Sequence, residues 1–119
     1  MTFRERLERI CARVEGALGA VLIAEDGIVV ERHVADPSLD LELASVEIVG
    51  AAREIRRATT AIDAGELQEL IVTNTGRLAV LRLVGPGYYL LLHLAPTALV
   101  GRGRYELRRE AHELASEFV

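Results

Sequence analysis

Residues 66–94 have the sequence ELQELIVTNTGRLAVLRLVGPGYYLLLHL, which contains three candidate strands, 66–73, 77–84 and 88–94. The two gaps between them are rich in Asn, Gly and Pro, which favour turns. Neither gap has room for a helix, so we expect an antiparallel meander. Apolar residues occupy both sides of these strands, and a sheet that is apolar on both faces has to be covered on both. This stretch predicts the middle layer of a helix–sheet–helix sandwich.

Two more candidate strands lie upstream, at 17–25 and 28–34. Asp26-Gly27 separates them and is a strong signal for a tight hairpin. The charged residues at 31–33 suit an edge strand, because charge hinders pairing with other sheets. We therefore expect a five-stranded antiparallel sheet with 28–34 at one edge.

Helical signals begin at the N-terminus, where Thr2 and Glu5 have the spacing of a capping box. Apolar residues then recur at helical spacing as far as Gly16, which favours the end of the helix. A second and longer helix is expected to start at about Ser38 and to run to about Ala61.

The last helix is expected to follow Pro96. Gly101 and Gly103 weaken its beginning, so regular helix is expected only from near Arg104. Its apolar face consists of Leu107, Ala111, Leu114, Ala115 and Phe118. The predicted order is helix, two strands, helix, three strands, helix, an α+β fold in one domain spanning residues 1–119.

Composition excludes several classes of protein. Half of the 119 residues are hydrophobic and 27% are charged, which is typical of a soluble globular domain. The net charge of −4 disfavours nucleic acid as a partner. No stretch is long enough to insert into a membrane, and no signal peptide is recognised, so we expect a cytoplasmic protein. Cys11 is the only cysteine and is expected in the core of the first helix.

The long middle helix carries two apolar stripes. The broader one is expected to pack on the sheet and consists of Leu41, Ala44, Ile48, Ala51, Ala52, Ile55, Ala58 and Ile62. The second lies almost opposite and consists of Leu39, Leu43, Val46 and Gly50. A surface helix usually has one apolar stripe with polar residues opposite. Two stripes indicate two apolar neighbours, of which the sheet is one.

We interpret the second stripe as a dimer interface. Burying a Leu or Val side chain contributes about 1.5–3 kcal/mol. Gly50 inside a helix costs about 1 kcal/mol relative to Ala, and close approach of another backbone would explain it. A chain this small has few elements left to cover the stripe. We therefore expect that a second copy of the chain, related by a two-fold axis, covers it. The alternative is a loop of the same chain over the stripe, or isolated surface leucines.

Landmarks spanning nearly the whole chain also point to a family. They are Gly19-Ala20-Val21-Leu22-Ile23 with Asp26-Gly27, the long helix after Ser38, Glu66-Leu67 with Leu70-Ile71-Val72, Gly87-Tyr88-Tyr89-Leu90, and Leu99-Val100-Gly101. Each is a common hairpin or strand pattern, but their order and spacing together are more specific. In that order and spacing the chain resembles the Roadblock/dynein light-chain family, in particular its bacterial gliding-regulator (MglB-type) branch.

The resemblance implies a profilin-like sheet and a homodimer, in which the second helices pair and the strand at 66–73 can join the two sheets. It further implies that the partner is a small Ras-like GTPase, which contacts the paired helices. Binding would alter the GTPase cycle or the location of that partner. The candidate GTPase-facing residues are Glu47, Arg53, Glu54 and Arg57. For any one of them, a solvated helix face is the alternative.

The sequence lacks recognisable catalytic motifs. No phosphate-binding glycine loop is present, and no serine has a nucleophile-elbow context. His33, His93 and His112 have no spacing that suggests a shared metal. No catalytic, cofactor-binding or metal-binding residue is therefore predicted, and an enzyme is the least favoured class. A dimerisation adaptor for larger assemblies and a small-molecule sensor of the PAS type are the alternatives to a GTPase regulator.

One further feature is a cluster of arginines at the start of the last helix, which consists of Arg102, Arg104, Arg108 and Arg109. Glu106 and Glu110 are interleaved with it, and pairs three or four residues apart can neutralise one another on a helix. We therefore expect a solvated face here rather than a binding patch.

Overall fold

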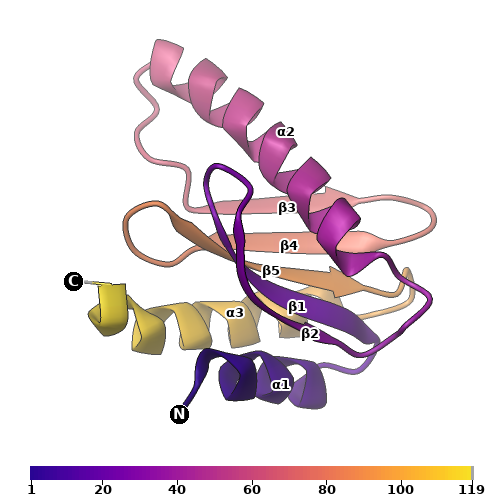
Figure 1. Ribbon diagram of the computed structural model, residues 1–119. Helices are drawn as coiled ribbons and strands as arrows, with labels where there is room; N and C mark the ends of the chain where they lie inside the picture. The colour runs from indigo at the N-terminus through magenta and orange to yellow at the C-terminus, as the bar shows by residue number, and fades with distance from the viewer. Residues whose placement is uncertain (119) are drawn as a thin grey trace.

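The computed structural model describes residues 1–118. Its elements in chain order are α1 (Phe3–Arg13), β1 (Ala17–Ala24), β2 (Val29–Val34), α2 (Leu41–Ala61), β3 (Glu69–Thr73), β4 (Leu78–Leu83), β5 (Tyr88–Leu94), α3 (Val100–Leu114) and a short 3₁₀ helix (Ala115–Phe118). The strands form one antiparallel sheet in the order β2-β1-β5-β4-β3. Helices α1 and α3 cover one face and α2 crosses the other (Figure 1). The predicted fold class and element order are confirmed.

Local signals in the sequence account for the first elements. Thr2 and Glu5 form the predicted capping box, with the Glu5 amide donating to Thr2 Oγ1 at 3.1 Å. Gly27 adopts a φ of +94° in the β1–β2 hairpin, a conformation that glycine reaches without strain. Strand β2 lies at an edge of the sheet, as its charges predicted.

Strand β5 lies at the centre of the sheet and supplies both cores. Its residues alternate, with Leu90 and Leu92 in the core under α1 and α3 and with Tyr89 and Leu91 in the core under α2. All four are fully buried. Burial on both faces explains why this strand is an almost continuous apolar run.

Helix α3 starts at Val100, so the expectation that regular helix begins only near Arg104 is wrong. The reason is the packing of Gly103, which is buried against β5. A side chain here would bring its first carbon to 3.2 Å from both Leu92 Cδ2 and Leu94 Cδ1. Gly103 therefore lets the first turns of α3 lie close to the sheet, and burial of the helix offsets the poor helix propensity of glycine.

The roll of α2 about its axis differs from the prediction. The side chains buried against the sheet are Leu41, Ser45, Val49 and Ala52, whereas Ala51, Ala58 and Ile62 of the predicted stripe are exposed. Two polar contacts hold this roll. Ser45 Oγ lies 3.0 Å from His93 Nε2 on β5, and the Arg56 guanidinium lies 5.9 Å from the centre of the Tyr89 ring. These contacts turn Ser45 and Arg56 inward and one apolar flank outward.

Candidate interaction surface on α2 and β3

The outer side of α2 exposes large apolar side chains. Leu43 is 59% exposed and Val46 is 36% exposed, and both belong to α2. Both were predicted in the second apolar stripe, and the described residues leave Leu43 largely uncovered and Val46 partly uncovered. Val46 lies at the edge of this surface, beside Gly27 of the β1–β2 hairpin.

Leu39 differs from the rest of the predicted stripe. Asp40 caps α2 by accepting a hydrogen bond from the Leu43 amide at 3.1 Å, so the helix starts at Leu41 and Leu39 lies before it. There Leu39 is only 9% exposed and packs in the core under α2. The expectation that Leu39 shares the outer face of the helix is therefore wrong, because the cap changes the direction of the chain between Leu39 and Leu41.

Gly50 continues the outer face about two helical turns beyond Leu43. A methyl group placed on Gly50 would contact only the Arg53 guanidinium, at 3.8 Å. Nothing within the described chain therefore requires a glycine at this position.

A second uncovered apolar flank of α2 consists of Ala51, Ile55, Ala58 and Ile62, which are exposed or half-buried. Ile48 continues this flank towards the sheet and lines a groove with Asn74 and Leu78, at the end of α2 nearest the β3–β4 turn. The helical pattern predicts that all of this flank packs on the chain's own sheet, which holds for Ile48 and not for Ala51, Ala58 and Ile62. The sequence does contain a signal for this uncovered flank. The apolar arc of α2 is broader than one helix can bury against one sheet.

Strand β3 borders the same side of the molecule and forms the second edge of the sheet. Among the described residues it pairs with β4 alone, which leaves one row of backbone groups without strand partners. Unlike β2, it has little charge to protect this edge: Glu69 is its only ionisable residue. Ile71 is 37% exposed on the face that α1 and α3 cover elsewhere. An exposed edge of this kind is suited to pairing with another strand.

The charged residues predicted to face a GTPase are all exposed on α2. Arg57 Nε lies 3.3 Å from Glu54 Oε2, so these two neutralise each other. Arg53 is turned towards the β1–β2 hairpin, where it donates to the Glu25 carbonyl oxygen at 3.0 Å. Glu47 lies on the same outer side as Leu43.

The one buried histidine is structural. Burial, together with the nearby charge of Arg77, lowers the pKa of His93 from 6.5 to about 4, so its imidazole is neutral at pH 7. Both His93 and its partner Ser45 are almost completely buried, which prevents a substrate from reaching the hydroxyl. Within residues 1–118, no group of three or more potential ligands could hold a metal, and no helix has the length and apolar character needed to cross a bilayer.

Comparison with known proteins gives several close structural matches. No protein-family model and no curated protein sequence matches the chain. MglC from Myxococcus xanthus is 37% identical to this chain and superposes on it with a TM-score of 0.72. The match covers 99% of this chain and 100% of the MglC chain. A Roadblock/LC7 domain from Streptomyces avermitilis is 20% identical, covers 98% of both chains, and has a TM-score of 0.86.

The gliding protein MglB from Thermus thermophilus is 22% identical, covers 94% of this chain and 84% of its own, and has a TM-score of 0.82. At these identities the MglB and Streptomyces structures support the fold, whereas the likeness to MglC extends to the sequence.

Proposed function

The chain belongs to the Roadblock/LC7 family, alongside the bacterial MglB and MglC proteins, and on that basis we propose that it is a homodimeric regulator of a small Ras-like GTPase. It acts by binding and positioning the GTPase and contributes no catalytic group of its own. The observation that carries the proposal is the uncovered surface formed by α2 and the edge of β3.

Dimerisation would cover both the exposed apolar side chains of α2 and the unpaired edge of β3. Pairing of two α2 helices across a two-fold axis covers Leu43 and Val46, and each buried side chain contributes about 1.5–3 kcal/mol. Gly50 then allows the two helix backbones to approach closely. Antiparallel pairing of two β3 strands satisfies the free edge and joins both sheets into one.

The GTPase binds on the outer side of the paired helices. In the dimer, two copies of Glu47, Glu54 and Arg57 lie close to the two-fold axis and offer charges of both signs to a partner. Arg53, bonded to the hairpin, lies at the margin of this surface. Charge patterns of this kind determine the specificity and the rate of association more than affinity.

Binding can be tested with the purified Ras-like GTPases of the same organism, each loaded with a fluorescent GTP analogue. We expect one of them to bind the wild-type chain and not the Leu43→Asp/Val46→Asp variant. Leu99→Asp is the matched control, because Leu99 is 78% exposed at the start of α3, away from α2. Failure of every GTPase to bind the wild-type chain, or equal binding by the double variant, contradicts the proposal.

A second candidate function is that of an adaptor, which dimerises larger assemblies without changing GTP hydrolysis. The contacts of Arg53 and Arg57 with Glu25 and Glu54 favour it, because either arginine would have to leave a partner in its own chain in order to reach a nucleotide. The hydrolysis rate of the bound GTPase separates the two functions, since an adaptor leaves that rate unchanged. A PAS-type sensor is less well supported, because it needs an internal pocket and leucines of β5 fill the centre of both cores.

A further inference from the structure

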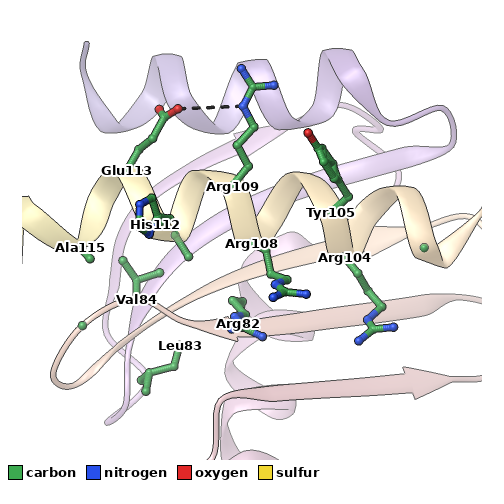
Figure 2. Close-up of a pocket in the computed structure, with 13 residues that line it drawn as sticks. Arg82, Leu83, Val84, Arg104, Tyr105, Arg108, Arg109, His112, Glu113 and Ala115 are labelled. Atoms are coloured by element: carbon green, nitrogen blue, oxygen red, sulfur yellow. Dashed lines mark ion pairs between the residues drawn. The ribbon is translucent and has the colours of Figure 1, made fainter.

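A groove of about 780 Å³ runs beside α3, on the face of the sheet opposite α2 (Figure 2). Arg104 and Arg108 extend from α3 over the sheet, and both line the groove together with Arg82 near the end of β4. Arg109 turns to the other side of the helix, where its Nε lies 4.0 Å from Glu113. We call the surface formed by Arg82, Arg104 and Arg108 the arginine groove.

The glutamates expected to neutralise these arginines have other partners. Glu110 is completely buried between α1 and α3, where Arg9 Nε approaches it to 2.6 Å and Arg6 Nη1 to 3.2 Å. Glu106 is paired with Arg102 at 3.1 Å. Local neutralisation within the helix is therefore confirmed for Arg102 and for Arg109, whose partner is Glu113. It is wrong for Arg104 and Arg108, because α1 supplies the partners of Glu110.

The arginine groove keeps an excess of positive charge. Glu69 of β3 lies 2.8 Å from Arg104 Nη2 and 3.6 Å from Arg82 Nη1. Glu113, which also lines the groove, is paired with Arg6, Arg9 and Arg109. Arg108 forms no ion pair with any residue between 1 and 118. Arg82 and Arg104 thus share one carboxylate, and Arg108 has none among residues 1–118, on a protein whose net charge is −4. A local patch of this sign attracts anionic partners despite the overall charge.

The shape of the groove fits an extended chain better than a compact anion. Its α3 wall includes residues from Gly101 to Ala115, a span of about 21 Å at the rise of an α-helix. A strand of about six residues has that length. Leu83 and the buried Val84 and Ala111 give the same groove an apolar part beside the arginines. Carboxylates alternating with apolar side chains complement such a surface, and guanidinium groups bind carboxylates through two parallel hydrogen bonds.

We propose that the arginine groove is a docking site for an extended acidic segment of a protein partner. Arg108 supplies a guanidinium group that has no ion-pair partner among residues 1–118, and Arg104 can exchange its contact with Glu69 for a carboxylate of the segment while Arg82 stays with Glu69. The site lies on the opposite face of the sheet from α2 (Figure 1), so it leaves the proposed α2 surface free. The inference does not depend on the proposed function.

The probe is a fluorescein-labelled decapeptide of alternating Glu and Leu, titrated with the full chain and followed by fluorescence anisotropy. We expect saturable binding that weakens as salt increases. The Arg104→Gln/Arg108→Gln variant should bind at least about tenfold more weakly, which corresponds to a loss of about 1.4 kcal/mol. The matched control is Arg4→Gln, which removes an exposed arginine from α1 outside the groove and should bind as the wild type does. Thermal melting followed by circular dichroism verifies that each variant is folded.

A second titration uses a single-stranded decauridylate carrying the same label, in order to distinguish carboxylate from phosphate recognition. Weaker binding of this oligonucleotide than of the peptide supports the proposal. Three results overturn it: no binding of the peptide to the wild-type chain, equal loss of affinity in the Arg4→Gln control, or tighter binding of the oligonucleotide.

Discussion

Ser45 of α2 and His93 of β5 form a buried hydrogen-bonding pair, with Oγ and Nε2 separated by 3.0 Å. Both side chains are nearly inaccessible to solvent, and they lie among apolar residues of the core under α2. In such surroundings a hydrogen bond specifies geometry, because any other roll of the helix would leave both groups without a partner. The pair therefore determines which side chains of α2 face outward.

Acid should destabilise the fold through His93. Its pKa is about 4 in the folded chain and 6.5 ordinarily, so between these values the unfolded chain binds a proton that the folded chain does not. Stability therefore falls as the pH decreases through this window, by about 2 kcal/mol between pH 7 and pH 5. Urea unfolding at the two pH values measures the difference. In His93→Gln this part of the pH dependence should disappear, and an unchanged pH dependence in that variant would exclude His93 as its cause.

Removing the Ser45 hydroxyl should cost about 1–3 kcal/mol, because Ser45→Ala leaves a buried imidazole nitrogen without its partner. Ser116→Ala serves as the control. Its hydroxyl donates to the Glu113 carbonyl oxygen on an exposed turn, so its loss should change stability by less than about 0.5 kcal/mol. Chemical denaturation of both variants gives the comparison, and equal effects would show that the buried pair contributes nothing.

Two glycines of α3 should respond to substitution in opposite directions. Gly103→Val places a branched side chain against Leu92 and Leu94 and should destabilise the fold by about 1–3 kcal/mol through overpacking. Gly101→Ala meets nothing within 4 Å and should stabilise the helix by about 0.5–1 kcal/mol. Melting temperatures that move in the same direction for both variants would contradict the packing described for α3.

Much of the fold could be predicted because its signals are local. The capping box at Thr2 and Glu5, the Asp26-Gly27 hairpin and the turns around β4 act over a few residues, and all of them form as expected. The order of elements then follows from short connections, and the resemblance to a family, now shown by the likeness to MglC, agrees with it.

The features that could not be predicted depend on contacts between distant residues. The roll of α2 is held by Ser45 with His93 and by Arg56 with Tyr89, pairs that no helical pattern reveals. For this reason the flank containing Ala51 and Ala58 was assigned to the wrong neighbour. The free charge of the arginine groove likewise depends on α1, whose arginines bind Glu110 across more than a hundred residues of chain.

Self-association of the chain tests the central claim most directly, since the proposed function needs the α2 surface to be covered by a second copy. Multi-angle light scattering at micromolar concentration should give twice the 13.0 kDa mass of one chain for the wild type and for Leu99→Asp. The Leu43→Asp/Val46→Asp variant should be folded and have the mass of one chain. A wild-type mass of 13.0 kDa, or a double variant that stays dimeric, would contradict the account.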